Sequence, residues 1–299
     1  MKPSYLEKLT PVELDNKVRR LYELLQDCRV CPNNCSVNRI AGETGDCHST
    51  DEVIISSASP HFGEEPPLVG FRGSGTIFFT SCNLSCQFCQ NYDISQLRRG
   101  EIVSTKELAA IMIKLQNIGC HNINLVTPTH FTPQIVKSIS IAVEMGLELP
   151  IVYNCGGYES VETLELIEDI IDIYMPDIKY SDNKNAQKYS GITNYWDIVK
   201  KAVIEMNRQV GNLHIDSKGI AKRGLLIRHL VLPNDIAGSE TVIDFIVNEI
   251  SPDSYVNIMD QYRPAYNSHK YTELNRSLNE IEYKSIVDYA KKFGVRLAG

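Results

Sequence analysis

Hydrophobic and polar positions follow two repeating patterns along most of this chain. Short apolar runs of strand length recur, and between them apolar residues return every three or four positions, as on one face of a helix. Strands that alternate with helices in this way form parallel sheets. The sequence therefore predicts an α/β fold, a partial (β/α)6 barrel of the TIM type. Its six strands are expected at about 75–80, 121–127, 150–154, 170–175, 224–232 and 254–259.

The chain on either side of these strands follows other patterns. Residues 10–27 carry apolar side chains at helical spacing behind a Thr10-Pro11 cap, which predicts an amphipathic helix. Residues 51–75 are rich in Ser, Pro and Gly, so we expect a linker there. We accordingly divide the chain into an N-terminal helix with a small metal-binding module at 1–60, a barrel at 61–270 and a C-terminal helical segment at 271–299.

Composition narrows the functions that fit. Of the 299 residues, 43% are hydrophobic and 22% are charged, as in soluble globular proteins. No apolar run approaches the ~20 residues of a membrane span, and the N-terminus lacks the apolar core of a signal peptide, so a cytoplasmic protein is expected. The net charge of −7 argues against a nucleic-acid partner, because neutralising phosphates requires clustered Lys and Arg.

Nine cysteines without secretory features indicate a reducing compartment and metal ligation in place of disulfides. Gly42 and Gly45 allow a tight turn before the last thiol of an upstream group, which can close around structural Zn²⁺ or hold an auxiliary [4Fe-4S] cluster. Spacing alone does not separate the two metals, so both stay open here. This group consists of Cys28, Cys31, Cys35 and Cys47.

A second group, Cys82, Cys86 and Cys89, directly follows the first predicted barrel strand at C-x3-C-x2-C spacing. Three thiols on one loop can hold three corners of a four-iron cube, which leaves one iron without a protein ligand. The next cysteine, Cys120, lies beyond a predicted helix. A zinc site is the alternative, but zinc in proteins usually has four protein ligands, or three that include His or a carboxylate. The spacing therefore favours a cluster with one open iron.

This motif resembles that of the radical S-adenosylmethionine (SAM) superfamily. The resemblance implies a [4Fe-4S] cluster whose open iron binds SAM, and reductive cleavage of SAM to a 5'-deoxyadenosyl radical. Phe88, before the third cysteine, stands where that superfamily packs an aromatic ring against the adenine. The segments Phe62–Pro67 and Cys89–Ser95 are similar to those of a subset of pyruvate formate-lyase-activating-enzyme-like proteins that carry an N-terminal four-cysteine module.

Residues just after the strands are the next candidates, because chemistry in such barrels gathers at the carboxyl ends of the strands. The superfamily usually places Gly-Gly-Glu after the second strand to hold the SAM amino group, whereas this chain has Thr-Pro-Thr-His. Met175–Lys179 resembles activating enzymes, in which an Asp and a Lys border the SAM carboxylate. Arg228 interrupts an apolar strand, so it is expected to face a ligand or to pair with Asp177 or Asp172. The residues expected around SAM are Phe88, Thr127, Thr129, Asn154, Asp177, Lys179 and Arg228.

These observations predict a radical SAM enzyme, an oxidoreductase similar to activating enzymes. The first hypothesis for its reaction is hydrogen abstraction from a protein glycine; the alternative is radical modification of another peptide or of a small molecule. A non-enzymatic iron–sulfur or zinc protein is a third interpretation. The resemblance implies a protein or peptide partner and an electron donor such as flavodoxin or ferredoxin. No catalytic role is assigned to His130 or Cys155.

Overall fold

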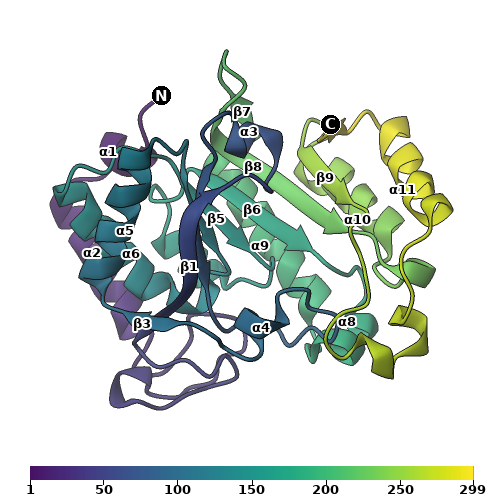
Figure 1. Ribbon diagram of the computed structural model, residues 1–299, viewed down its shortest axis with the longest axis horizontal. Coiled ribbons are helices and arrows are strands. Elements are labelled where there is room, and N and C mark those ends of the chain that lie inside the picture. The colour runs from purple at the N-terminus through teal and green to yellow at the C-terminus, as the bar shows by residue number, and fades with distance from the viewer. Residues whose placement is uncertain (299) are drawn as a thin grey trace.

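The computed structural model describes residues 1–298, which form one twisted sheet of ten strands flanked by helices (Figure 1). Six central strands run parallel in the order β2-β4-β5-β6-β8-β9. The prediction of a partial (β/α)6 barrel is confirmed. The strands are β2 (Ser74–Phe79), β4 (Ile123–Val126), β5 (Ile151–Cys155), β6 (Ile173–Ile178), β8 (Ala221–Leu230) and β9 (Tyr255–Met259).

Helices connect the parallel strands and cover the outside of the sheet (Figure 1). The first of them begins at a capping box in which the Ser104 hydroxyl accepts from the Glu107 amide and the Glu107 carboxylate accepts from the Ser104 amide. It ends at Gly119, whose φ of 100° suits a glycine. The connecting helices are α5 (Thr105–Ile118), α6 (Thr132–Glu144), α7 (Val161–Leu166), α8 (Asn183–Ser190), α9 (Tyr195–Val210) and α10 (Ser239–Phe245).

The segment expected to be a linker contains a long strand instead. β1 (Val53–His61) pairs antiparallel with β2, and the short β3 (Glu101–Val103) pairs with the other edge of β1. The linker prediction is therefore wrong. The strand lacks a clear sequence pattern because most of its length is polar or partly exposed, it contains Pro60, and its register shifts between Ile55 and Ser57.

After β1 the chain turns into the barrel and fills the end opposite the carboxyl ends of the strands. The short helix α3 (Pro66–Val69) places Leu68 in full burial, and Asn122 Nδ2 donates a hydrogen bond of 2.9 Å to the Leu68 carbonyl. Figure 1 shows α3 at the end of the sheet away from α4 (Tyr92–Ser95). Leu68 packs in a separate apolar cluster with Val152, Ile173, Met175, Leu213, Ala221, Leu226 and Tyr255.

The N-terminal part docks firmly on the barrel. Helices α1 (Ser4–Glu7) and α2 (Pro11–Glu23) lead to the four-cysteine loops, and α2 packs against α6 and α7. The guanidinium of Arg39, which is 1% exposed, donates to the His130 carbonyl at 2.6 Å and to the Thr50 carbonyl. These bonds fix the module to the loop after β4.

The C-terminal part continues the sheet. After β9, helix α11 (Glu280–Lys292) precedes β10 (Arg296–Leu297), which adds in parallel to β9. The two-residue β7 (His214–Ile215) pairs with β8 away from the main path. Among the residues that the structure describes, no helix combines the length and the apolar character needed to cross a bilayer.

The buried position of Leu68 leads to a prediction about stability. Leu68→Ala should lower the free energy of unfolding by about 2–5 kcal/mol, because it removes a fully buried side chain and leaves a cavity. Denaturant unfolding of the purified protein measures the loss. Ile281→Ala, at a side chain that is 82% exposed, is the control and should leave the unfolding midpoint unchanged. An equal change in the unfolding midpoint for the two substitutions would contradict the packing of α3 in the core.

Candidate active site

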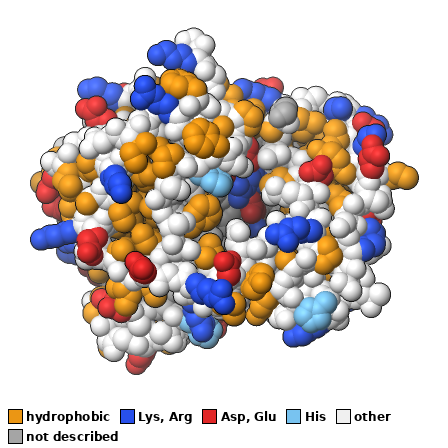
Figure 2. All heavy atoms as spheres, viewed as in Figure 1, with side chains coloured by type: hydrophobic (Ala, Val, Ile, Leu, Met, Phe, Trp, Pro, Cys, Tyr) orange, Lys and Arg blue, Asp and Glu red, His pale blue; other side chains and the backbone are white. Residues whose placement is uncertain are grey.

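A cavity of about 400 Å³ opens at the carboxyl ends of the barrel strands. Figure 2 shows a hollow near the centre of the molecule, with acidic and basic side chains visible inside it. The three cysteines of the second group and all but one of the residues expected around SAM line the cavity. Those lining residues are Cys82, Cys86, Cys89, Phe88, Thr127, Asn154, Asp177, Lys179 and Arg228.

The three cysteines lie on the loop that follows β2, and their sulfurs accept or share hydrogen bonds. The Leu84 amide donates to Cys82 Sγ at 3.4 Å, and the Ser190 hydroxyl donates to Cys86 Sγ at 3.1 Å. Cys89 Sγ lies 3.1 Å from the Ser95 hydroxyl. Burial raises the pKa of the Cys82 and Cys86 thiols. Hydrogen bonds to ligand sulfurs are one of the means by which a protein sets the potential of a cluster.

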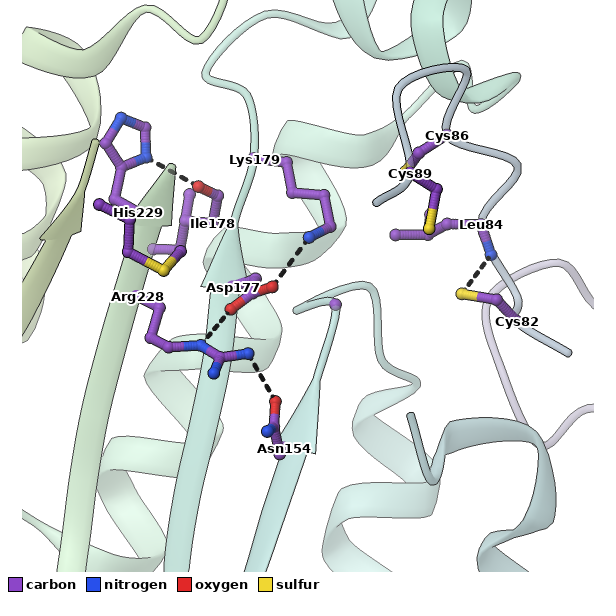
Figure 3. Close-up of polar contacts among 12 residues, drawn as sticks. Cys82, Leu84, Cys86, Cys89, Asn154, Asp177, Ile178, Lys179, Arg228 and His229 are labelled. Carbon is purple, nitrogen blue, oxygen red and sulfur yellow. Dashed lines mark hydrogen bonds and ion pairs between the residues drawn. The ribbon is translucent and has the colours of Figure 1, made fainter. Parts of the chain in front are cut away.

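One carboxylate holds both basic side chains of the cavity. Asp177 accepts from Arg228 Nε at 2.6 Å and from Lys179 Nζ at 2.9 Å, and Arg228 Nη2 also donates to Asn154 Oδ1 at 2.7 Å (Figure 3). Burial by itself would raise the pKa of Asp177, but the two cations outweigh burial and lower it to about 2. The same pairing raises the pKa of Lys179 against its own burial. All three groups are therefore charged at neutral pH.

Arg228 forms the ion pair that was one of the two expectations for it. It forms an ion pair with Asp177, and it lies in the cavity wall, because β8 places its side chain on the inner face of the barrel beside Asp177 of β6. Figure 3 shows Lys179 on the side of Asp177 that faces the cysteines, and Arg228 on the other side. The network therefore runs from the cysteine loop across the mouth of the barrel.

Sequence reasoning missed two acidic residues, of which Glu64 lies in the cavity wall and Glu65 lies next to it in the chain. Glu64, with its side chain 7% exposed, lines the cavity and pairs with Arg228 at 3.3 Å. Glu65 Oε1 accepts from Asn257 Nδ2 of β9 at 2.8 Å, while its Oε2 is buried without a hydrogen-bond partner among residues 1–298. Burial raises the pKa of Glu64, and Arg228 moderates the rise. The sequence did carry a sign of these residues, since two adjacent acids stand between Gly63 and Pro66.

Aromatic side chains form the wall beside the third cysteine. Phe88 is 5% exposed and lies edge-on to Tyr180 and Tyr262, with ring centroids at 6.2 and 5.9 Å. Its ring is thereby held in place in the cavity wall. Thr127 also lines the cavity, with a φ of 59° that turns the chain sharply after β4.

Thr129 does not line the cavity, and this corrects its expected place beside SAM. Its hydroxyl donates to Glu159 Oε1 at 2.7 Å in a buried network that also contains Tyr153. Burial raises the pKa of Glu159 to about 7. His130 is buried too, its Nε2 lies 2.8 Å from the Thr80 carbonyl, and burial lowers its pKa to about 3.

The four upstream cysteines lie outside the cavity. Cys28, Cys31 and Cys47 are buried, whereas Cys35 is partly exposed and accepts from the Asp46 amide at 3.4 Å. Burial raises the pKa of Cys31 and Cys35, and the nearby thiols of Cys28 and Cys47 add to the rise in both. A Cβ on Gly45 would lie 2.5 Å from Cys35 Sγ, so this glycine makes the space for the thiol. The donor set fits a metal centre.

Across residues 1–298, the structure gathers no three His, Cys, Asp or Glu side chains at a distance suited to one metal ion. Structural zinc and a [4Fe-4S] cluster therefore both stay open for the upstream group.

Comparison with known proteins identifies the family of the barrel. The family model described as Radical SAM superfamily matches residues 76–215. An uncharacterized protein of Methanocaldococcus jannaschii, MJ0674, is 33% identical over 302 residues, which cover 98% of this chain and 82% of that protein. A second uncharacterized protein of that organism, MJ0808, is 23% identical over 274 residues, which cover 84% of this chain and 72% of that protein.

Several solved structures are similar at low sequence identity. They include anSMEcpe with bound AdoMet (12% identity, 72% of this chain and 58% of that chain, TM-score 0.49) and Streptococcus suis SuiB bound to precursor peptide SuiA (15%, 74% and 47%, TM-score 0.48). Methylornithine synthase, PylB, matches over 97% of this chain and 75% of its own, at 14% identity and a TM-score of 0.47. The chain spans about half the length of the first two structures.

The Asp177 network leads to a prediction about stability. Asp177→Asn should lower the free energy of unfolding by about 3–5 kcal/mol, because it leaves the charges of Arg228 and Lys179 partly buried without their carboxylate. Denaturant titration of the protein under anaerobic conditions measures the change. Glu280→Gln removes an exposed ion pair with Lys284 and should have no measurable effect. A loss as small as that of the control would mean that water already screens the network.

Proposed function

Since this chain belongs to the radical SAM superfamily, we propose that it is an activating-enzyme-like member that takes a hydrogen atom from a glycine residue of a partner protein. The protein is a radical SAM enzyme that cleaves SAM. Membership of this superfamily argues against the third interpretation, a non-enzymatic iron–sulfur or zinc protein. The identity of the substrate is the new element of the proposal.

We assign Cys82, Cys86 and Cys89 to the catalytic [4Fe-4S] cluster, and the remaining cavity residues to SAM. When bound, the cluster and SAM supply the reductive cleavage that yields a 5'-deoxyadenosyl radical. Asp177 holds the Lys179 ammonium on the side of the cysteine loop, where it suits the SAM carboxylate. Phe88 offers an apolar face for the adenine. The amide of Asn154, fixed by Arg228, and the Thr127 loop complete the wall around SAM.

The size of the cavity is the observation that carries the substrate assignment. Pockets for drug-sized ligands range over about 300–1,000 Å³, and SAM is itself a ligand of that size. A cavity of about 400 Å³ lies near the lower end of that range, which favours SAM as its main occupant. The group that gives up the hydrogen has to reach in from the mouth on a longer molecule. A glycine on an extended loop fits this requirement best, because it carries no side chain that would need room.

Two features of the sequence favour an activating-enzyme-like reaction on glycine over modification of another peptide. The segment Met175–Lys179 and the Tyr189–Ile192 turn resemble those of pyruvate formate-lyase-activating enzymes. In the structure these two segments meet, since Ser190 donates to Cys86 and Lys179 lies beside the same loop. Radical modification of another peptide or of a small molecule is the alternative. For the electron donor we propose a flavodoxin or a ferredoxin. For the compartment we propose the cytoplasm, because nine free cysteines suit a reducing environment.

The upstream thiols, Cys28, Cys31, Cys35 and Cys47, are proposed to hold an auxiliary [4Fe-4S] cluster. Four thiols on adjoining loops and the hydrogen bond from the Asp46 amide to Cys35 Sγ support a cluster. Structural zinc is the alternative, and metal content distinguishes the two.

The catalytic assignment is tested by cleavage of SAM. Anaerobically reconstituted protein with dithionite and SAM should form 5'-deoxyadenosine, measured by chromatography, and Cys89→Ala should abolish the product because the cube loses one of three ligands. Cys120→Ala, at a buried thiol outside both groups, is the control and should retain activity. Undiminished product with Cys89→Ala would refute the assignment.

The substrate assignment is tested with deuterated glycine. Proteins extracted from cells grown on glycine deuterated at its α-carbon should transfer deuterium to 5'-deoxyadenosine, detected by mass spectrometry, and electron paramagnetic resonance should show a glycyl radical on the acceptor protein. Extracts labelled instead with deuterated alanine are the control and should transfer none. Transfer from the alanine label alone would favour the alternative of another peptide position.

The metal of the upstream centre is tested by replacing its ligands. Changing Cys28, Cys31, Cys35 and Cys47 together to Ala should lower iron by about four atoms per chain while the catalytic cluster stays. Elemental analysis and Mössbauer spectra of the anaerobic protein measure this. Loss of one zinc at constant iron would instead show a structural zinc site.

A further inference from the structure

One edge of β1 has no neighbouring strand over most of its length. β3 pairs only with Val53, Ile54 and Ile55 at the start of β1, whereas the rest of the strand pairs with β2 alone. Figure 1 shows β1 in front of the parallel strands, with β3 at one end and α3 at the other. Residues 56–61 therefore present a free edge of the sheet, which we name the β1 edge.

The register of β1 determines which backbone groups point out from this edge. Pro60 lies opposite Gly75 of β2, and the Gly75 amide donates away from β1, to the Asn122 carbonyl at 3.0 Å. The pair of Pro60 and Gly75 is therefore not hydrogen-bonded, so the Pro60 carbonyl points away from β2. Because the direction alternates along a strand, Ala58 presents both its N–H and its carbonyl on the same side. None of these groups has a hydrogen-bond partner among residues 1–298.

The side chains along the β1 edge leave room for another strand. Ser57 and Ser59 are small and exposed, and Ala58 packs its side chain against the core. Since Pro60 has no N–H, the edge offers one donor, on Ala58, and two acceptors, the carbonyls of Ala58 and Pro60. Unpaired groups of this kind are where an extended peptide adds to a sheet by main-chain pairing.

The β1 edge also borders the candidate active site. His61, at the end of β1, and Gly63 and Glu64 just beyond it line the cavity. Phe78 lines the cavity as well, and it pairs with Ser57 in the middle of β1. Figure 2 shows the hollow on the same face of the molecule on which Figure 1 shows β1. An extended segment on the β1 edge would therefore pass beside the cavity.

Two adjacent arginines at one end of the β1 edge indicate the charge of the occupant. Arg98 and Arg99 are exposed, and neither forms an ion pair among residues 1–298. Gly100 lies against β1, since a Cβ there would be 2.5 Å from the Ile55 carbonyl oxygen. In a chain with a net charge of −7, such a pair attracts an acidic segment only locally and so favours one position for it.

From these observations we propose that the β1 edge binds an extended acidic segment of the partner protein, which adds to the sheet as a further strand. The segment pairs with Ala58 and Pro60 through its main chain, and its acidic side chains lie against Arg98 and Arg99. The inference rests on the proposed function, because this segment is the one that carries the glycine. Main-chain pairing holds such a segment extended beside the cavity with little dependence on its other side chains.

The test measures binding of short fluorescent peptides to the full chain, purified anaerobically with its metal centres. The first probe alternates Thr and Val around a central Gly and ends in two Glu residues, and the second ends in two Lys residues instead. The third is the Glu peptide with N-methyl groups on its peptide nitrogens, which cannot donate to the β1 edge. In fluorescence anisotropy we expect the Glu peptide to bind roughly tenfold more tightly than either of the other two.

Two variants separate the backbone of the edge from the charge. Ala58→Pro removes the N–H donor of the β1 edge without removing a hydrogen bond to β2, and it should weaken binding of the Glu peptide roughly tenfold. Arg98→Glu with Arg99→Glu should reverse the preference between the Glu and Lys peptides, and it tests the inference even if Ala58→Pro does not fold. Lys291→Glu with Lys292→Glu, on α11 at the other end of the sheet, is the matched control and should bind as the wild type.

Equal binding of the Glu and Lys peptides, or undiminished binding of the N-methylated peptide, would overturn the inference. So would a dimer of the full chain that Ala58→Pro dissociates in sedimentation, since a second copy would then occupy the β1 edge. Binding is measured without turnover of SAM, so its absence leaves deuterium transfer from glycine as a separate test of the proposed function. Failed deuterium transfer with intact peptide binding would refute the assignment of glycine alone.

Discussion

A single half-buried carboxylate organises the catalytic end of this barrel. Asp177 takes two cations, Arg228 from the neighbouring strand and Lys179 from its own strand end, and through Arg228 it reaches Asn154 and Glu64. Three charged groups in a mostly enclosed cavity are stable only because each has a partner of opposite charge. The result is a rim of fixed dipoles and charges beside the cysteine loop. A zwitterionic ligand with a sulfonium meets polar groups that are already oriented, so little reorganisation accompanies its binding.

The parts of this structure that the sequence predicted are those in which local pattern and tertiary structure agree. Parallel strands buried on both faces are continuous apolar runs, and the Ser104 capping box marks a helix start by itself. Arg228 was identified because a charge in an apolar strand requires a partner. The strand β1 was not predicted, because its residues are polar on the exposed side and its pairing has a register shift. Thr129 was misplaced because the direction of a side chain after a strand depends on the turn, and the φ of Thr127 sets that turn.

Contacts between distant loops were beyond sequence reasoning for a different reason. The Glu64–Arg228 pair joins positions 164 apart, and a hydrogen bond from Asn33 Nδ2 to the Asn83 carbonyl joins two cysteine motifs that each make sense separately. A single sequence shows which residues are suited to bind, but not which of two suitable groups will lie together. The N-terminal module is a case in point: its spacing predicted a metal centre, and its position against the catalytic loop became visible only in the fold. That position makes it part of the active end of the enzyme.

The packing of α3 and the residue before it against the last strands has a consequence for the order in which this protein is made. Leu68 and Glu65 belong to the first quarter of the chain, yet they contact Leu226, Tyr255 and Asn257, which leave the ribosome much later. The cysteines at 82–89 therefore emerge into the cell while the barrel beneath them still lacks its last strands. Contacts of such long sequence separation form late. Insertion of the catalytic iron–sulfur unit into a closed site consequently belongs to the period after translation, when the newly completed polypeptide can shelter it from oxygen.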